Sequence, residues 1–413
     1  MRVNILSLLL LLGAHAGLTL GQAWPFGPFV TSGRWIHNSQ GKNVTYAGAN
    51  WPGAADVMIP EGLQYASITS IVSGIKSLGL NVIRLTFAIE MIDDIYDNGG
   101  DKTLLVAFQK ALGTANGLKV YNQVLAKNPS FNATTTRVQV YDAVAAECLK
   151  QQIYVHLDNH MSKGGWCCST DDGNSWFGDT YFDVTKWKRG LNYMATRGAK
   201  WGNMMSIGLR NELRQPSNNA AVSATYNWET WYTNVVAAAK GVNAANPNTL
   251  IFLSGLGFDT TLAPLTTGAN LGSGTVFRKS DFTFANKLVL EIHNYQNSAT
   301  SCSSITSGLY TDGFNALDTT NSAIKNVFPV VMTEFGYDQT DTSYTGVYAT
   351  CLRSYLPAQK AGWMLWALGG SYYIRSGTQD FDETWGLYNH DWSAWRNSNS
   401  LSAIKSMAAA TLA

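Results

Sequence analysis

The sequence predicts an α/β fold: a single (β/α)8 (TIM) barrel with inserted helices and loops. Short apolar runs alternate with longer amphipathic segments along the chain, which is typical of βα units around a parallel sheet. The short runs number eight, the number of strands that closes such a barrel. An open Rossmann-type sheet is the alternative, but no GxGxxG motif follows an early strand.

The strands and helices follow from this alternation. The predicted strands are the apolar runs at 44–50, 81–87, 152–158, 204–210, 249–254, 287–293, 329–334 and 362–368. The predicted helices lie between and after them, at 66–78, 137–150, 185–197, 226–245, 316–326, 344–359 and 401–413. Gly79 provides a C-cap for the first of these helices. Segment 88–136 is longer than one crossover helix requires, so we expect inserted helices there.

The N-terminus has the features of a secretory signal peptide. Arg2 supplies a positive charge, residues 6–12 form an apolar core, and Gly21-Gln22-Ala23 is a small-residue cleavage site, with cleavage after Ala16 as a second possibility. No later run reaches the roughly 18 apolar residues of a membrane span. We therefore expect a leader at 1–23, a single barrel domain at 24–413, and a soluble, secreted protein without membrane contact.

The balance of charge limits the class of partner. The formal net charge is +1, and no basic or acidic block occurs along the chain. Nucleic acids and anionic lipids are recognised through concentrated positive charge, so neither is an expected partner. The composition favours a neutral ligand.

Five cysteines in a secreted chain indicate disulfide bonds. We expect a Cys302–Cys351 bond and a second bond from Cys148 to Cys167 or Cys168, which leaves one thiol over. The sequence contains no CxxC pair, so a zinc site is not expected. The sequons that begin at Asn43 and Asn132 could carry glycans if they are exposed.

Polar side chains gather where the predicted strands end. In a (β/α)8 barrel these carboxyl ends form one face, and that face carries the functional residues. The polar and aromatic residues found there are Asn50, Trp51, Arg84, Asp158, His160, Asn211, Glu212, His293, Tyr295, Glu334 and Trp366.

Two carboxylates on different strands suit the cleavage of a glycosidic bond. Glu212 and Glu334 could act as a pair, one protonating the leaving oxygen while the other attacks the sugar carbon or activates water. Their environments must then separate their pKa values, with Arg84 keeping Glu334 ionised and apolar neighbours keeping Glu212 protonated. Either Glu alone could be a surface salt bridge, but a buried strand such as VVMTE has little reason to end in an unpaired carboxylate.

Six short motifs, in their order along the chain, resemble glycoside hydrolase family 5, the cellulase family. These motifs are NVIRLTF, LDNH, LRNE, EIHNY, TEFG and GWMLWAL, and the resemblance covers roughly residues 44–395. It implies that residues 24–413 form a catalytic domain with a retaining mechanism, in which Glu212 is the acid/base and Glu334 is the nucleophile. It also implies substrate-binding or orienting roles for Arg84, His160, Asn211, His293, Tyr295 and Trp366.

One position departs from the family pattern, which usually has proline after Asn-Glu. Leu213 stands there, and Arg214 follows it. The difference indicates an altered subsite beyond the acid/base and a less-studied branch with plant and fungal members. The segment at 166–183 also looks peculiar to that branch, and we expect it to form a loop over the cleft.

Aromatic rings stack on the apolar faces of sugars, so exposed tryptophans are candidate sugar platforms. We expect Trp366 to be one, followed by Trp51 and Trp176. Together these features predict a secreted retaining β-glycoside hydrolase that acts on a β-linked glucan, mannan or related glycoside, with an oligo- or polysaccharide as its partner and no cofactor or metal.

Two alternative functions use the same residues differently. The first is a catalytically inactive barrel that only binds carbohydrate. The second is a metal-dependent hydrolase that uses His156, Asp158 and His160, which period-two spacing places on one strand face.

Overall fold

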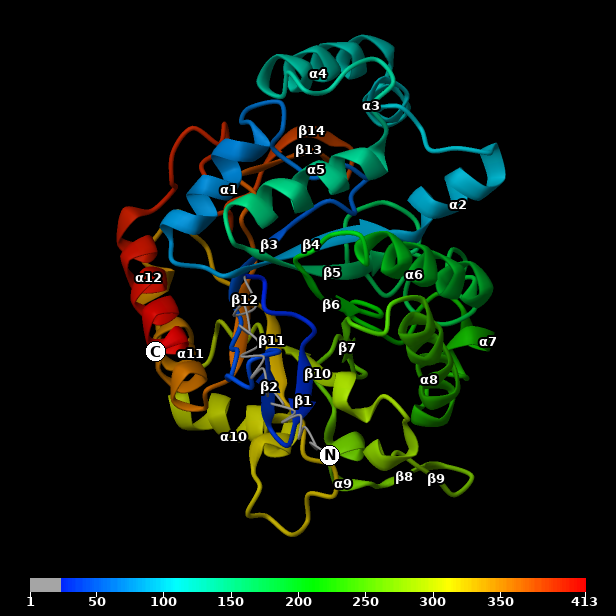
Figure 1. The fold of residues 1–413 in the computed structure, drawn as a ribbon, viewed down its shortest axis with the longest axis vertical. Helices are drawn as coiled ribbons and strands as arrows, with labels where there is room; N and C mark the ends of the chain where they lie inside the picture. Colours follow the sequence, from blue (N-terminus) through cyan, green and yellow to red (C-terminus); the bar gives the residue numbers. More distant parts are fainter. Residues whose placement is uncertain (1–23) are drawn as a thin grey trace, which may run out of the picture.

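The chain folds into a closed barrel of eight parallel strands (Figure 1), seen in a computed structural model that describes residues 24–413. Around the barrel the strand order is β10-β11-β12-β3-β4-β5-β6-β7. The barrel strands are β3 (Ala47–Trp51), β4 (Val82–Ala88), β5 (Tyr154–Met161), β6 (Met204–Gly208), β7 (Leu250–Leu253), β10 (Leu288–His293), β11 (Val330–Phe335) and β12 (Gly362–Leu365). Each overlaps one of the eight predicted segments, so the predicted fold class is confirmed.

Burial explains why the barrel strands are nearly continuous apolar runs. A parallel sheet covered by helices outside and by its own side chains inside has no wet face. All seven residues of β4 are buried, and so are all eight of β5. At the amino end of the barrel, Phe29 and Ile36 pack with strand residues such as Val82 and Phe252 and close that end.

Six predicted helices form close to their expected positions. They are α1 (Ile68–Ser77), α5 (Arg137–Lys150), α6 (Val184–Gly198), α8 (Trp228–Ala245), α11 (Val347–Ala358) and α12 (Ser398–Leu412). In α1, the Ser67 side chain accepts a hydrogen bond from the Ser70 amide at 3.1 Å, as an N-cap residue does. Ile68, Ile71 and Ile75 then lie on one buried stripe of the helix.

The predicted helix at 316–326 is wrong. The helix of this connection is α10 (Cys302–Asp312), followed by a short 3-10 turn at Phe314–Leu317. Beyond it, Asp318 Oδ1 accepts hydrogen bonds from the Thr320 and Asn321 amides at 2.9 and 3.2 Å. These local side-chain bonds replace the i to i−4 bonds that a helix would need, so the segment turns instead.

The remaining elements are insertions and short hairpins. The predicted insertion at 88–136 contains α2 (Ile89–Asn98), α3 (Leu104–Leu112) and α4 (Thr114–Lys127), and α3 and α4 lie at the outer edge of the molecule in Figure 1. A hairpin follows β12. The other elements are β1 (Val30–Ser32), β2 (Trp35–His37), α7 (Ala220–Ser223), α9 (Ala263–Thr267), β8 (Asn270–Gly272), β9 (Thr275–Val276) and the hairpin strands β13 (Ser371–Arg375) and β14 (Thr378–Asp382).

Two further predictions concern the surface and the N-terminus. Both sequon asparagines, Asn43 and Asn132, are exposed. Within residues 24–413, none of the helices combines the length and apolar character needed to cross a membrane. The predicted leader at 1–23 lies outside the described residues.

The disulfide pairing agrees with one prediction and overturns the other. Cys302 on α10 is bonded to Cys351 on α11, as expected. The predicted bond from Cys148 is wrong, because Cys167 and Cys168 are bonded to each other and Cys148 is a free, buried thiol on α5.

Removal of the Cys302–Cys351 bond by a double Cys→Ala change should lower the free energy of unfolding by about 2–4 kcal/mol, because the bond closes a long loop in the unfolded chain. The two cysteines are 49 residues apart in sequence. Chemical denaturation of the variant and the unaltered protein measures this difference. An unchanged unfolding midpoint and slope would contradict the expectation.

Candidate active site

A cavity of about 470 Å³ opens where the barrel strands end. Its wall is built by side chains from six of the eight strands or the loops that follow them, as the fold predicts. The lining residues are His160, Trp166, Cys167, Cys168, Asn211, Glu212, Gly257, Phe258, Thr260, His293, Tyr295, Glu334, Trp366, Arg375, Glu383 and Trp385.

The two predicted carboxylates face each other in this cavity. Glu334 lies near the end of β11, and Glu212 follows β6, with β7 and β10 between these strands in the barrel. One carboxylate oxygen of each, together with a ring nitrogen of His293, lies within 4.8 Å of the others. Residues 122 positions apart in sequence are therefore brought into one reacting volume by barrel closure.

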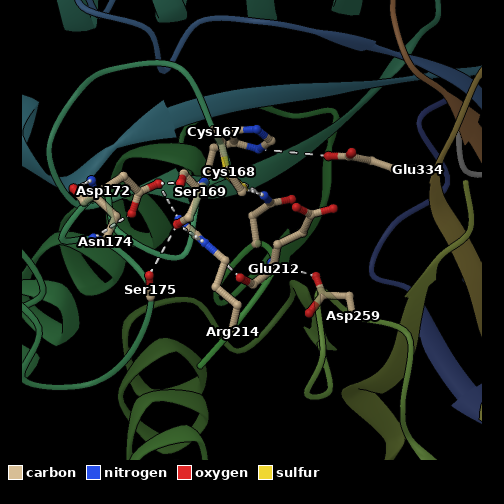
Figure 2. Close-up of a disulfide and its surroundings, with 12 residues drawn as sticks. Cys167, Cys168, Ser169, Asp172, Asn174, Ser175, Glu212, Arg214, Asp259 and Glu334 are labelled. Atoms are coloured by element: carbon tan, nitrogen blue, oxygen red, sulfur yellow. Dashed lines mark hydrogen bonds and ion pairs between the residues drawn. A yellow bond between two sulfur atoms is a disulfide. The ribbon is translucent and has the colours of Figure 1, made fainter. Parts of the chain in front are cut away.

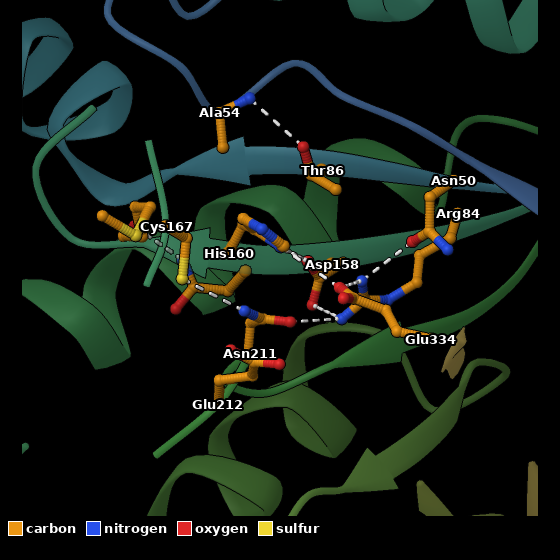
Figure 3. Close-up of polar contacts among 12 residues, drawn as sticks. Asn50, Ala54, Arg84, Thr86, Asp158, His160, Cys167, Asn211, Glu212 and Glu334 are labelled. Atoms are coloured by element: carbon orange, nitrogen blue, oxygen red, sulfur yellow. Dashed lines mark hydrogen bonds and ion pairs between the residues drawn. The ribbon is translucent and has the colours of Figure 1, made fainter. Parts of the chain in front are cut away.

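Arg84 from β4 organises the polar cluster beneath the cavity (Figure 3). It forms an ion pair with Glu334, and its Nη2 lies 2.9 Å from Asp158 Oδ1. It also donates hydrogen bonds to Asn50 Oδ1 at 2.9 Å and to Asn211 Oδ1 at 2.8 Å. Burial opposes the charged form of Arg84, but Asp158 and Glu334 outweigh it and raise the pKa of Arg84. The guanidinium is thus a permanent positive charge against Glu334.

Further contacts orient Glu334 and the ring of His160. The Tyr295 hydroxyl donates to Glu334 Oε2 at 2.8 Å. Burial and the neighbouring Glu334 carboxylate raise the pKa of Tyr295 well above its usual range, so it remains a donor. His160 Nδ1 lies 2.7 Å from Asp158 Oδ2. Burial alone would raise the pKa of Asp158, but Arg84 and His160 lower it to about 2, so Asp158 is a carboxylate that fixes both partners.

The environment of Glu212 differs from that of Glu334. Burial raises the pKa of Glu212, and the neighbouring His160, Arg214 and Arg84 only partly oppose it. His293 Nδ1 lies 2.9 Å from Glu212 Oε1, and burial lowers the pKa of His293 to about 4. A neutral His293 therefore accompanies a carboxyl group that retains its proton to higher pH than usual.

The backbone of Glu212 adopts a conformation that most residues avoid. Its φ is +48°, in the left-handed region, which costs roughly 1–3 kcal/mol for such a residue. The surroundings hold it there: its amide donates to Asp259 Oδ2 at 2.8 Å, and its carbonyl accepts from Arg214 Nη1 at 2.8 Å. This conformation directs the Glu212 side chain away from the strand path and into the cavity.

The two arginines of the LRNELR run support the loop after β5. Arg210 donates to the Asn174 carbonyl at 2.6 Å. Arg214, drawn in Figure 2, donates to the Ser169 carbonyl at 2.7 Å and to Asp172 Oδ2 at 2.5 Å. The predicted loop over the cleft at 166–183 is thereby fastened to the strand end that carries Glu212. Three charged residues therefore follow β6: Glu212 faces the cavity, and Arg210 and Arg214 hold the loop that forms its wall.

Trp366 forms part of the cavity wall, as predicted. Its ring is stacked on that of His160, with centroids 5.3 Å apart and an interplanar angle of 7°. Gly336 makes room for this arrangement, because a Cβ at that position would lie 2.2 Å from the Trp366 carbonyl oxygen. The glycine of the TEFG motif thus lets the end of β11 approach Trp366.

The predictions of Trp51 and Trp176 as sugar platforms are wrong. Both side chains are fully buried, and neither lines the cavity. The Trp51 indole donates to the Glu61 carbonyl at 3.0 Å, and the Trp176 indole donates to the Thr225 carbonyl at 3.1 Å. Each ring therefore packs in the core with its one polar atom satisfied.

Several cavity residues were not singled out as site residues from sequence. Trp166 lies in the loop after β5, and the Arg375 guanidinium lies 3.4 Å from the centre of its ring. Arg375 also forms an ion pair with Glu383 at 2.9 Å. Phe258, Cys167, Cys168 and Trp385 complete the group. All of them lie in segments that follow barrel strands, and the sequence marked Trp166, Cys167 and Cys168 only as part of the loop at 166–183 expected over the cleft.

Among residues 24–413, two sets of side chains converge closely enough to hold a metal ion. They are Glu212 with His293 and Glu334, and Glu212 with Cys167 and Cys168, so neither contains the predicted alternative of His156, Asp158 and His160. His156 instead contacts Ser206 Oγ at 2.8 Å, and burial together with Arg84 lowers its pKa to about 3. Asp158 is occupied by Arg84 and His160.

The barrel resembles solved cellulase structures. An endocellulase from Pyrococcus horikoshii in complex with cellotetraose matches with a TM-score of 0.68 and 16% identity, covering 94% of this chain and 100% of that chain. The catalytic domain of the major endoglucanase from Xanthomonas campestris pv. campestris matches with a TM-score of 0.66 and 17% identity, covering 92% and 99%. At these identities, the similarity supports the fold.

The sequence comparisons are more specific. A "Glycosyl hydrolase 5 family protein" from Chamaecyparis obtusa is 34% identical over 393 residues, which span 92% of this chain and 65% of the relative. The model of the cellulase family, glycosyl hydrolase family 5, matches residues 37–371. Since this match covers most of the chain, the chain belongs to glycosyl hydrolase family 5.

Proposed function

We propose that the chain is a secreted retaining β-glycoside hydrolase. The observation that carries the proposal is the approach of Glu212 and Glu334, whose nearest carboxylate oxygens lie within 4.8 Å. Retaining enzymes hold the two carboxyl groups about 5–5.5 Å apart, whereas inverting enzymes need about 6.5–9.5 Å to admit a water molecule. The short separation favours direct attack by one carboxylate on the sugar.

In the first step, a Glu334 carboxylate oxygen attacks the anomeric carbon. The bond from that carbon to the glycosidic oxygen breaks, and the oxygen takes the proton of Glu212 as the leaving sugar departs. The product is a glycosyl ester on Glu334 and a Glu212 carboxylate. The raised pKa of Glu212 supports its role as the proton donor.

In the second step, the Glu212 carboxylate takes a proton from water. The water oxygen attacks the anomeric carbon, and the ester bond to Glu334 breaks. Two successive inversions return the original configuration, and both carboxyl groups return to their starting states. The reaction needs no cofactor or metal in this scheme.

The neighbouring side chains bind and orient. Arg84 and Tyr295 hold Glu334 for attack through the ion pair and the 2.8 Å hydrogen bond. Asn211, whose Oδ1 is fixed by Arg84 and whose amide nitrogen faces the two sulfurs in the cavity wall, donates a hydrogen bond to the sugar 2-hydroxyl. His160 and Trp366 contact the sugar at the cleavage point, and His293 fixes Glu212.

The substrate in this proposal is a β-linked glucan, mannan or related glycoside, presented as an oligo- or polysaccharide. Membership of the cellulase family supports this class. Secretion is supported by the leader-like sequence at 1–23 and by the Cys302–Cys351 disulfide, since such bonds persist in oxidising compartments. In such a compartment, exposed Asn43 and Asn132 are expected to carry glycans.

A panel of β-linked glucans, mannans and aryl β-glycosides tests the proposal. Proton NMR during hydrolysis identifies the anomer that forms first, before mutarotation. We expect turnover of at least one β-glycoside and a β-anomer as the first product. First release of the α-anomer would exclude the retaining mechanism, and binding without turnover would favour the inactive carbohydrate-binding barrel instead.

The pH profile should have an alkaline limb set by Glu212. The first step needs Glu212 protonated, so the rate is retained below its pKa and is lost as the pH rises through it. Because burial raises that pKa, the loss should occur above the ordinary value of about 4.3. The dependence of kcat/KM on pH measures it. A decline already complete near pH 5 would contradict the assignment of Glu212 as the acid.

A further inference from the structure

The bonded pair Cys167–Cys168 forms part of the cavity wall, and the scheme above gives it no role. The two cysteines follow β5, in a loop over the carboxyl end of the barrel (Figure 2). Both are partly exposed and line the cavity. A disulfide between neighbouring residues presents two sulfur atoms and their β-carbons as one compact apolar surface.

This surface lies beside the acid/base side chain. The sulfurs of Cys167 and Cys168 and a carboxylate oxygen of Glu212 lie within 4.8 Å of one another. Glu212 also belongs to the second close set, with His293 and Glu334. In the view of Figure 3, Asn211 and Glu212 lie between Cys167 on one side and Glu334 on the other.

The position of the disulfide is fixed from both directions. The Asn211 amide nitrogen lies 3.4 Å from the Cys167 sulfur and 3.5 Å from the Cys168 sulfur. On the other side, Arg214 binds the carbonyl of the next residue, Ser169, at 2.7 Å and the Glu212 carbonyl at 2.8 Å. One arginine thus ties the disulfide loop to the backbone of the acid/base residue.

A second apolar surface lines the cavity from the loop after β7. The Phe258 side chain is 36% exposed, although its backbone amide is bonded to the Leu213 carbonyl at 3.1 Å. Leu213 directly follows Glu212, so the backbone of Phe258 is bonded to the residue next to the acid/base, and both Phe258 and Glu212 line the cavity.

We propose that the Cys167–Cys168 disulfide and Phe258 form the subsite for the leaving sugar. The inference rests on the proposed function: Glu212 must reach the oxygen that departs, so groups beside Glu212 and away from Glu334 face the leaving part of the glycan. Sulfur is soft and polarisable, and aromatic rings stack on the apolar faces of sugars. The subsite thus takes a pyranose ring by its CH-bearing face.

Two substrates with the same glycone separate this subsite from the rest of the site. Cellotetraose can place sugar units in it, whereas β-cellobiosyl fluoride releases only fluoride. In the variant with Cys167→Ala and Cys168→Ala, the ratio of kcat/KM for cellotetraose to kcat/KM for the fluoride should fall about tenfold, the effect of losing one stacking contact. Phe258→Ala, which leaves the disulfide in place, should lower the same ratio.

The matched control is the variant with Cys302→Ala and Cys351→Ala, which removes a disulfide from outer helices and should leave the ratio unchanged. An unchanged ratio in both the Cys167/Cys168 and the Phe258 variants would overturn the subsite, even if both rates fell together. The unaltered protein could hydrolyse neither substrate and still become labelled on Glu334 by a fluoroglycoside. In that case cellobiosyl compounds are not its substrates, and the proposed subsite for a leaving glucan is overturned. If it neither hydrolyses nor labels, the proposed function itself fails.

The covalent state of the pair is checked by mass spectrometry of the unreduced protein. The peptide that contains Cys167 and Cys168 should be two hydrogens lighter than the same peptide after reduction. A dithiol in the freshly purified secreted protein would contradict the proposal, because the compact surface requires the bond.

Discussion

Replacement of Glu334 by glutamine should reduce turnover by about 10⁴-fold or more, as loss of a nucleophile typically does. The glutamine side chain has nearly the same shape but is neutral and a poor nucleophile, so no glycosyl ester forms. The amide can still accept a hydrogen bond from Tyr295, and Arg84 retains its contacts with Asp158 and Asn211. Initial rates on the best substrate of the glycan panel measure the loss.

Thermal unfolding of the variant separates lost chemistry from lost structure. A Glu334→Gln protein that unfolds cooperatively and still binds oligosaccharide would place the defect in the reaction. Glu147→Gln is a suitable control, because Glu147 lies on α5 and pairs with Lys150 rather than with the cavity. Turnover near the unaltered rate in the Glu334 variant would contradict the nucleophile assignment.

Replacement of Glu212 by glutamine should have a large effect that depends on the leaving group. General acid catalysis contributes about 10²–10⁴-fold, so hydrolysis of an unactivated glycan should fall by that factor. The phenolate of an activated aryl glycoside, such as a 2,4-dinitrophenyl glycoside, leaves without protonation. The rate of the first step should therefore be retained for this substrate, and the glycosyl ester on Glu334 should accumulate. A burst of dinitrophenol followed by slow turnover is the expected signature.

Azide tests the role of Glu212 as the general base of the second step. It attacks the glycosyl ester without a general base, so it should restore steady-state turnover of the aryl glycoside by Glu212→Gln and yield a glycosyl azide. The alkaline limb of the pH profile should also be lost in this variant. Equal losses for glycan and aryl glycoside, with no response to azide, would contradict the acid/base assignment.

The positions of the barrel strands were predictable because each is a short, almost entirely buried run with a distinct end. Once eight such runs close into a barrel, the residues at their carboxyl ends must meet, whatever their separation in sequence. The direction of the parallel strands was therefore enough to bring Arg84, Glu212 and Glu334 together from sequence alone. In the structure, Glu212 and Glu334 line the cavity and Arg84 is buried beneath it.

Tryptophan burial could not be predicted in the same way. Trp51 is the last residue of β3 and Trp366 directly follows β12, yet Trp51 is fully buried and Trp366 lines the cavity. A carbonyl at 3.0 Å satisfies the Trp51 indole, and that partner, Glu61, comes from a loop whose path the sequence does not reveal. Both residues are tryptophans at a strand end, so the sequence gives the same expectation for each. Only the conformation of the neighbouring loops decides which of the two side chains is buried.

The remaining errors have local causes. The expected helix at 316–326 does not form because the Asp318 side chain binds the following backbone amides instead. A periodic apolar pattern in the sequence does not reveal such local bonds. The prediction of a bond from Cys148 did not consider that the adjacent Cys167 and Cys168 can pair with each other. The cavity residues contributed by the hairpin after β12, such as Arg375, were missed because this hairpin lies outside the eight barrel strands whose ends were considered.

Covalent labelling with a 2-deoxy-2-fluoro β-glycoside tests the central claim most directly. The fluorine slows both steps, and an activated leaving group lets the first step proceed, so the glycosyl ester is trapped. Digestion and mass spectrometry should find the label on Glu334, in the peptide that contains VVMTEFGY, with loss of activity in proportion. A label on any other residue of an inactivated protein would contradict the assignment of Glu334 as the nucleophile.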